Sequence, residues 1–208
     1  LADPVGIDLT GFAGVVVSPG VPLNQHPIAA HAASFGVPVI GDIELFAIAR
    51  PNLPAHRVVG ITGTNGKSTT TTLIGHILKE AGRDVRVGGN IGTGVLDLAA
   101  LHSNAVYVLE LSSYQLDLVK SLHCNVAVML NLSPDHLDRH GGMDGYQAAK
   151  MRIFHNQGPR DVAVVGFDDI YTQSIAIGLS ASGPQRVTQI SSTYTLGKGV
   201  SAVEGRLY

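Results

Sequence analysis

Cysteine and charged residues are scarce in this sequence, and tryptophan is missing. Cys124 is the single cysteine among 208 residues, so no disulfide can form within the chain and nothing indicates an oxidising compartment. Charged residues make up 14% of the chain, against about 25% in an average globular protein. A hydrophobic fraction of 45% together with a net charge of −2 excludes intrinsic disorder.

The charge balance and the lack of long apolar runs limit the possible partners. A net charge of −2 gives no general attraction to nucleic acid or to anionic membranes. No apolar run approaches the length of about 20 residues that a membrane helix requires, and no secretory signal opens the chain. We therefore expect a soluble, cytoplasmic globular protein without nucleic acid or membrane partners. We also expect it to be a monomer.

Both ends of the sequence are abrupt. Leu1 stands where a Met would begin the protein, and Leu207-Tyr208 follows Gly205-Arg206 with no sign of a terminal helix. We expect a fragment of a longer protein.

The first 52 residues predict a Rossmann-like alternation of strand and helix. β-branched runs predict the strands, and an Ala-rich stretch and a possible Asp42 cap predict the helices. In chain order we expect a strand at 15–17, a helix at 27–35, a strand at 37–40 and a helix at 42–50. Pro51 and Pro54 then indicate a linker. We interpret residues 1–52 as belonging to a first domain.

Residues 53–208 predict a second α/β domain, a doubly wound and mostly parallel sheet of the P-loop type with a β-rich tail from residue 185. The expected strands are continuous apolar runs, which is typical of a parallel sheet covered on both faces. They lie at 57–62, 85–87, 105–109, 126–130 and 162–165. The expected helices lie at 68–81, 113–121 and 146–156. In the first of these helices, the spacing places Leu73, Ile74, Ile77 and Leu78 on one buried face.

The strongest local motif is Gly63-Thr64-Asn65-Gly66-Lys67-Ser68, between a predicted strand and a predicted helix. Such a loop lets backbone N–H groups and a helix N-terminus converge on phosphate oxygens, with the lysine reaching the phosphates and the serine hydroxyl suited to Mg²⁺. The strict P-loop has Gly at the position held here by Ile61, so this is a shortened variant. The alternative is an ordinary glycine turn, but the strand–loop–helix context favours an ATP or GTP site.

Two further residues are candidates on position alone. Glu110 and His136 follow predicted strands, where they would face the nucleotide crevice; an exposed carboxylate and a structural histidine are the alternatives. Asp135 and Asp138, beside His136, could instead cap a helix. Spacing alone predicts that Lys150 faces solvent. Gly88-Gly89-Asn90-Ile91-Gly92 is either a turn or a loop that lets a substrate approach Asn90.

Four strings together resemble the Mur ligase family of peptidoglycan synthesis. They are Gly63 to Ser68, Gly89-Asn90-Ile91-Gly92, Leu109-Glu110-Leu111-Ser112-Ser113-Tyr114-Gln115-Leu116 and Asp135-His136-Leu137-Asp138. The shortened phosphate loop is the form that this family uses. The resemblance implies a three-domain protein of which this chain holds the later part of the first domain and an incomplete central ATP-binding domain. The domain that binds D-glutamate would be absent.

The resemblance also assigns roles to individual residues. It implies that Lys67, His136 and Lys150 act in catalysis, and that Lys150 is carbamylated by CO₂ rather than exposed to solvent. The residues implied to bind ATP are Gly63, Thr64, Asn65, Gly66, Lys67, Ser68 and Thr69. Those implied to hold two Mg²⁺ ions are Ser68, Glu110, His136 and Lys150. Those implied to bind the nucleotide sugar are Ser18, Gly20, Asn90, Ser112, Gln115 and His136.

The implied activity is ATP-dependent formation of an amide bond. UDP-N-acetylmuramoyl-L-alanine would become an acyl phosphate, and D-glutamate would displace the phosphate. Two alternatives stay open: another Mur or folylpolyglutamate-type ligase, and a non-catalytic nucleotide-binding module. Because a whole domain would be missing, we expect the chain alone not to complete the ligation.

Overall fold

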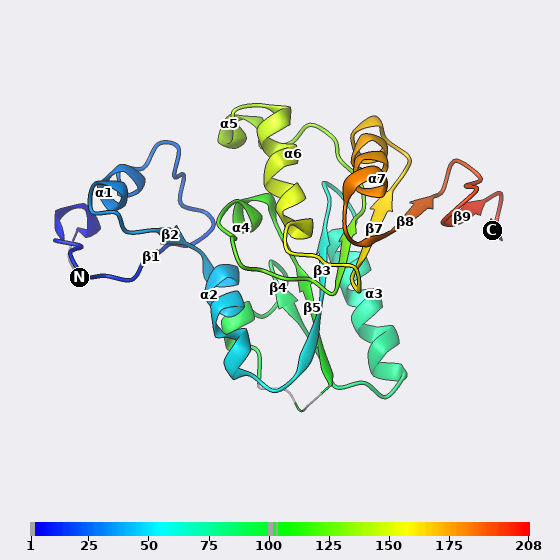
Figure 1. The fold of residues 1–208 in the computed structure, drawn as a ribbon, viewed down its shortest axis with the longest axis horizontal. Helices are drawn as coiled ribbons and strands as arrows, with labels where there is room; N and C mark the ends of the chain where they lie inside the picture. The colour runs from blue at the N-terminus through cyan, green and yellow to red at the C-terminus, as the bar shows by residue number, and fades with distance from the viewer. Residues whose placement is uncertain (1–2, 100–101, 103) are drawn as a thin grey trace.

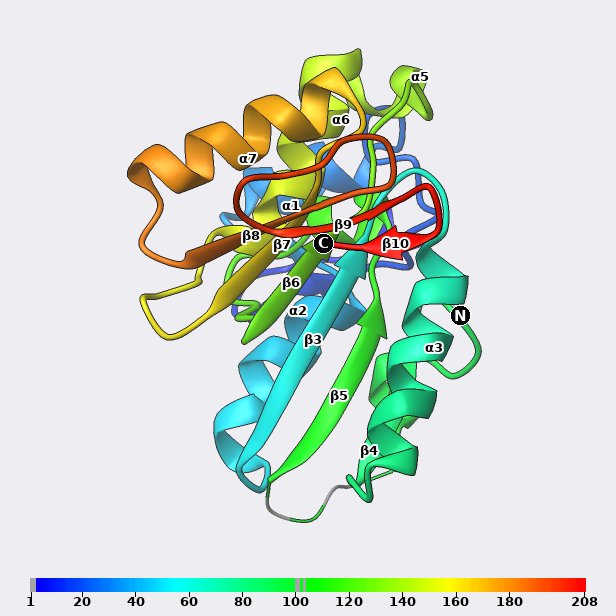
Figure 2. The ribbon, with the colours of Figure 1, turned by 90° about the vertical axis from the view of Figure 1, so that its right-hand side faces the viewer.

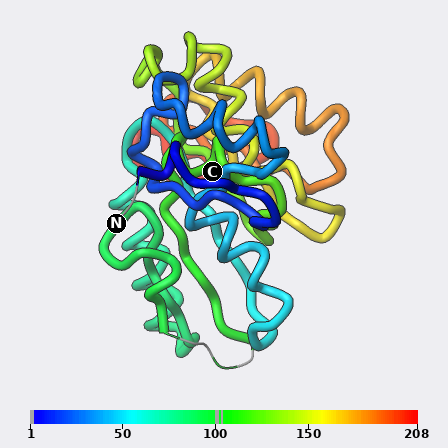
Figure 3. The backbone as a smooth tube through the Cα atoms, turned by 90° about the vertical axis from the view of Figure 1, so that its left-hand side faces the viewer, coloured from blue at the N-terminus to red at the C-terminus, as the bar shows by residue number. Residues whose placement is uncertain are grey.

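Two sheets organise the chain in the computed structural model, which describes residues 3–99, 102 and 104–208 (Figure 1). The smaller sheet pairs β1 (Val15–Val16) with β2 (Val39–Ile40) in parallel, and α1 (Ile28–Ser34) connects them. This confirms the strand–helix–strand alternation expected there. Leu1, one of the two observations behind the expectation of a fragment, lies outside the described residues. In Figures 1 and 3 this N-terminal part, drawn in blue, lies to one side of the larger sheet.

The larger sheet has eight strands in the order β10-β9-β8-β7-β6-β3-β5-β4, all parallel except the antiparallel pair β9–β10. Its strands are β3 (His56–Thr62), β4 (Val85–Gly89), β5 (Ala105–Glu110), β6 (Val126–Met129), β7 (Val162–Gly166), β8 (Arg186–Ser191), β9 (Val200–Val203) and β10 (Arg206–Leu207). The five apolar runs predicted as strands and the extended tail are confirmed.

Helices cover both faces of the larger sheet. On one face lies α3 (Lys67–Glu80), which packs on Val106, Val108 and Val128 (Figure 2). The helices against the opposite face are α2 (Asp42–Ala49), α4 (Ser113–Asp117), α6 (Met143–Met151) and α7 (Ile170–Ser182). A short α5 (Leu137–His140) precedes α6, and 3₁₀ turns lie at Pro4–Gly6, Arg50–Asn52, Val95–Asp97 and Arg152–Phe154. This confirms the predicted doubly wound α/β architecture. In the described part of the chain, no helix combines the length and apolar character needed to cross a bilayer.

The buried face of α3 differs from the prediction. Ile74 and Leu78 pack on the sheet as expected, but Leu73 and Ile77 are 53% and 55% exposed. The reason is Gly75, where an added Cβ would lie 2.4 Å from Cγ2 of Val87. The helix approaches β4 through this glycine, so the sheet-facing stripe is centred one residue away from the predicted one.

Helix boundaries differ from the predicted ones where distant groups end the helix. The helix expected at 113–121 stops at Asp117 because the buried Glu44 carboxylate accepts hydrogen bonds from the backbone N–H groups of Lys120 and Ser121, at 2.7 and 3.0 Å. The helix expected at 146–156 begins at Met143 and gives way to a 3₁₀ turn after Met151.

The predicted helix caps were wrong. Gly41, not Asp42, is the N-cap of α2, and the Asp42 carboxylate instead accepts from Nε2 of Gln115 at 3.1 Å. Neither Asp135 nor Asp138 caps α5, because His136 occupies the N-cap position with a left-handed φ of 50°. The sequence analysis did not predict α7, whose N-cap is Asp169; this carboxylate accepts from the N–H groups of Tyr171 and Thr172.

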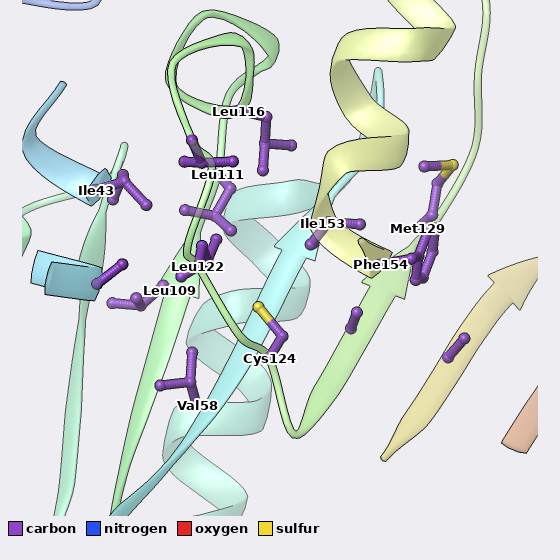
Figure 4. Close-up of a cluster of buried hydrophobic side chains, with 14 of the residues drawn as sticks. Ile43, Val58, Leu109, Leu111, Leu116, Leu122, Cys124, Met129, Ile153 and Phe154 are labelled. Carbon is purple, nitrogen blue, oxygen red and sulfur yellow. The ribbon is translucent and has the colours of Figure 1, made fainter. Parts of the chain in front are cut away.

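The main core joins α2 to the larger sheet. Ile43 and Phe46 of α2 are buried in one cluster with Leu109 and Leu111 from the end of β5, and Figure 4 shows Ile43, Leu109 and Leu111 in this cluster. The predicted domain boundary at residue 52 stays a prediction. The structure shows that α2, which precedes this boundary, packs in the same core as the strands that follow it.

Candidate functional site

The loop 63–66 joins the carboxyl end of β3 to the N-terminus of α3. Gly66 adopts a φ of +80°, a left-handed conformation that side chains disfavour, so glycine is required at this turn. Asn131, just after β6, fixes the loop from outside. Its backbone carbonyl accepts from the N–H of Thr64 at 3.0 Å, and its side-chain oxygen accepts from the N–H of Asn65 at 2.8 Å.

Lys67 folds back over this loop. Its ammonium donates to the carbonyl oxygens of Gly63 and Thr64, at 3.1 and 2.8 Å. The first turn of a helix carries unpaired N–H groups and the positive end of the helix dipole, so the loop presents cationic and N–H groups together. This arrangement suits a phosphate group.

Glu110 occupies the carboxyl end of β5 and is 2% exposed. The Ser68 hydroxyl donates to one carboxylate oxygen at 2.6 Å, and the Asn90 amide donates to the other at 2.8 Å. The alternative considered from sequence, that Glu110 is an exposed and solvated carboxylate, is therefore wrong. A hydroxyl and a carboxylate are oxygen donors of the kind Mg²⁺ prefers. Within the described residues, no three His, Cys, Asp or Glu side chains gather as a metal site by themselves.

Lys150 is buried, at 2% exposure, which contradicts the solvent-facing lysine that spacing predicted. Its ammonium donates to the hydroxyl of Thr62 at 3.2 Å and to the carbonyl of Gly63 at 2.9 Å. Burial, and then the charge of Lys67, lower the pKa of Lys150 to about 7. An amine with this pKa is neutral in a large fraction of molecules near neutral pH, and a neutral amine is nucleophilic.

A pocket of about 160 Å³ lies between Lys67 and Lys150. Its lining residues are Lys67, Asn90, Ser112, Ser113, Tyr114, Asp135, His136, Tyr146 and Lys150. The pocket lies where β3, β5 and β6 end, as predicted for a ligand site in an α/β sheet. Lys67, Asn90, Ser112, His136 and Lys150 were all candidates from sequence, so the fold brings together five residues spread over 84 positions of the chain.

The other candidates lie outside this lining: Gly63 to Gly66, Ser68 and Glu110, described above, and four more. Gln115 is buried and forms a capping box with Ser112, whose N–H donates to Oε1 of Gln115 at 3.1 Å. Thr69 is exposed one residue after Ser68 on α3. Ser18 and Gly20 are exposed in the turn after β1.

The sequence analysis missed the aromatic side of the pocket. The Tyr146 hydroxyl is 3.1 Å from the Thr64 hydroxyl, and its ring lies 4.9 Å from the Lys150 ammonium. Tyr114 packs its ring against His136 at 5.0 Å between centroids. One signal was available: Tyr146 stands four residues before Lys150, which places both on one helix face.

Comparisons with known proteins show which family the chain resembles. A model of the Mur ligase middle domain matches residues 61–196. The chain is 63% identical to the UDP-N-acetylmuramoylalanine–D-glutamate ligase of Novosphingobium aromaticivorans over 182 residues, which is 88% of this chain and 41% of the relative. It is 53% identical to the ligase of the same name from Caulobacter vibrioides, over all of this chain and 45% of the relative.

Solved structures show the same fold. The MurF ligase of Thermotoga maritima, solved in complex with ADP, superposes over all of this chain and 58% of its own length with a TM-score of 0.54, at 20% identity. The chain spans less than half the length of the two curated relatives above. Since the middle-domain match covers well over half of the chain, the chain belongs to the Mur ligase family.

Proposed function

We propose that this chain is part of an ATP-dependent ligase that joins D-glutamate to UDP-N-acetylmuramoyl-L-alanine, with release of ADP and phosphate. The observation that carries the proposal is that Lys67 of the phosphate loop and the buried Lys150 line one pocket, while Glu110 is hydrogen-bonded to Ser68 and to Asn90 of the same lining. The names of the relatives at 63% and 53% identity support the choice of substrates.

Residues 63–69 would bind the phosphates of ATP. Lys67 would exchange the carbonyls of Gly63 and Thr64 for phosphate oxygens, as the position of its ammonium in the loop allows. The ADP bound by the Thermotoga maritima ligase, which shares the fold, supports a nucleotide here.

Ser68 and Glu110 fit one Mg²⁺, since their side-chain oxygens already meet at 2.6 Å. His136 and Lys150 would hold a second ion once the Lys150 amine has added CO₂ and become a carbamate. The lowered pKa of Lys150 supports that modification, because CO₂ reacts with the neutral amine. Bound Mg²⁺ would neutralise charge on the transferring phosphoryl group.

The nucleotide sugar would contact Asn90 and Ser112, which line the pocket. Gln115 would act by holding Ser112 through the capping box, and Ser18 and Gly20 would approach the diphosphate. The substrate carboxylate and the triphosphate repel each other, so aligning them is the main task of the site. Attack of the carboxylate on the γ-phosphate gives an acyl phosphate, which the amine of D-glutamate then opens.

The direct test is calorimetric titration of the chain with a non-hydrolysable ATP analogue and Mg²⁺. We expect Lys67→Ala to abolish binding, whereas Lys79→Ala, on the last turn of the same helix, leaves it unchanged. Equal binding by the wild-type chain and Lys67→Ala would contradict the phosphate site.

The substrate assignment needs the full-length parent. We expect it to release ADP with UDP-N-acetylmuramoyl-L-alanine and D-glutamate, and not with a folate and L-glutamate. We expect Lys150→Met to abolish this activity, a loss that a non-catalytic nucleotide-binding module would not predict. We also expect the 208-residue chain alone to show no glutamate-dependent ADP release.

A further inference from the structure

Two carboxylates of α2 hold α4, the helix whose first turn supplies part of the pocket lining. Asp42 is the first residue of α2, and it accepts from Nε2 of Gln115 at 3.1 Å. Glu44 is buried, and it accepts from the N–H groups of Lys120 and Ser121, just beyond the other end of α4. The position of α4 therefore depends on two groups from a helix some seventy residues earlier in the chain.

The contact with Asp42 fixes the orientation of the Gln115 amide. An ionised carboxylate only accepts hydrogen bonds, so the amide atom that faces Asp42 is the nitrogen. The amide oxygen then faces Ser112, whose backbone N–H and hydroxyl lie 3.1 and 3.2 Å from it. Gln115 is 3% exposed, so these contacts are shielded from solvent.

This orientation decides what Ser112 offers to the pocket that it lines. A serine hydroxyl has one donor and two acceptor positions. The Ser112 hydroxyl donates to Oε1 of Gln115, and it accepts from the backbone N–H of Gln115 at 3.2 Å. The part of the chain that the structure describes leaves the second acceptor position open. Because its N–H and its O–H are both used, Ser112 presents an acceptor to a ligand.

We infer that Asp42 is a positioning residue of the ligase: through Gln115, it holds Ser112 as a hydrogen-bond acceptor for an N–H or O–H group of the nucleotide sugar. The inference rests on the proposed function, which supplies the ligand beside Ser112. UDP-N-acetylmuramoyl-L-alanine carries such donors in its sugar hydroxyls and its amide N–H groups. Asp42 is not part of the described pocket lining, so it acts through the two residues between.

The first test compares Michaelis constants in the full-length parent. Asp42→Ala removes the acceptor of the Gln115 amide. We expect KM for UDP-N-acetylmuramoyl-L-alanine to rise about tenfold while KM for ATP stays within about twofold, because the phosphate loop is not involved. Asp117→Asn, which changes an exposed carboxylate on α4, is the matched control and should alter neither constant. An unchanged KM in Asp42→Ala, or equal rises for both substrates, would overturn the inference.

An exchange of groups tests the contact between Asp42 and Gln115 directly. Gln115→Glu alone would bring two carboxylates together at this contact and should raise KM for the nucleotide sugar about tenfold or more. Adding Asp42→Asn returns an amide donor to the contact, while the new carboxylate still accepts from Ser112. We expect the double variant to recover KM to within about threefold of the wild-type value. A folded double variant without this recovery would overturn the inference.

Hydrogen exchange tests the same contact without turnover. In the 208-residue chain, NMR should show the Nε2 protons of Gln115 exchanging at least about tenfold faster in Asp42→Ala than in the wild type. Equal exchange rates would overturn the role of Asp42. A wild-type parent that releases no ADP with the nucleotide sugar would instead contradict the proposed function, and the exchange rates would still decide whether Asp42 holds Gln115.

Discussion

Lys67 and Lys150 donate to the same carbonyl oxygen, that of Gly63, at 3.1 and 2.9 Å. Two ammonium groups on one acceptor repel each other, and burial adds to the effect for Lys150. The backbone of the phosphate loop therefore couples the protonation of Lys150 to the position of Lys67. When Lys67 turns towards a bound phosphate, Lys150 keeps the Gly63 carbonyl to itself.

The first prediction is a rise of stability with pH that depends on Lys150. Its pKa is about 7 in the folded chain and near 10.5 when unfolded, so the unfolded chain binds more protons between these values. The unfolding free energy should therefore rise from pH 7 to 10, by at most about 1.4 kcal/mol per pH unit from this group. Below pH 7, Lys150 is charged in both states and the cost of burying the charge no longer changes with pH. Urea unfolding in CO₂-free buffer with EDTA measures the unfolding free energy at each pH. In Lys150→Met this free energy should rise less between pH 7 and 10.

The second prediction concerns the pair Ser68 and Glu110. Glu110→Gln keeps the shape of the side chain but removes the charge that a divalent cation would need, and Ser68→Ala removes the hydroxyl. Each should weaken Mg²⁺-dependent binding of an ATP analogue by about tenfold or more, while Mg²⁺-free binding changes little. Calorimetry with and without EDTA separates the Mg²⁺-dependent binding of the analogue from its Mg²⁺-free binding. Glu80→Gln, at the exposed end of α3, is the control, and an equal effect there would count against the metal assignment.

The third prediction is a positioning role for Tyr146. Tyr146→Phe keeps the ring beneath Lys150 but loses the hydroxyl that meets Thr64 at 3.1 Å. We expect a stability loss of about 1 kcal/mol and a several-fold weaker affinity for the ATP analogue, because the phosphate loop loses one of its supports. Thermal unfolding and calorimetry measure the two effects. An unchanged nucleotide affinity would show that the hydroxyl contributes to stability alone.

The fourth prediction compares two glycines. An added Cβ at Gly60 would lie 2.7 Å from the buried Cys124 sulfur, so Gly60→Ala should destabilise the chain by about 1–3 kcal/mol. At Gly178, inside α7, the same Cβ would meet open space, so Gly178→Ala should stabilise by about 0.5–1 kcal/mol. Denaturant unfolding of both variants measures the difference. Shifts of the same sign would contradict the close packing between β3 and Cys124.

The elements that sequence predicts best are those with a simple pattern. The five apolar runs became parallel strands, and the turn at Gly66 divided strand from helix as expected. The helix α7 has no such pattern, because Ile175 is buried while Ile170 and Ile177 are exposed. Apolar residues on both sides of a helix hide its periodicity, and the Asp169 cap was the one local signal.

Some residues of the site could also be predicted from a simple pattern and others could not. The predicted strand ends indicated that Lys67 and Glu110 lie close together, because parallel strands bring their carboxyl ends to one edge of the sheet. Burial of Lys150 depends on Thr62 and Gly63, more than 85 residues earlier in the chain. Spacing within one helix cannot report a partner at that distance, and the family resemblance was what placed this lysine in the site.

The position of α2 has a consequence for how the molecule comes apart. Ile43 and Phe46 are shared with the core of the larger sheet, and Asp42 is tied to Gln115 behind the pocket. Heating should therefore melt residues 42–208 in a single cooperative transition, and protease cleavage near Pro51 should leave the two pieces associated. A fragment beginning at residue 53 would lack Ile43 and Phe46, would expose the apolar surface that they cover, and should aggregate. A fragment beginning at Gly41 would keep α2 and should stay in solution.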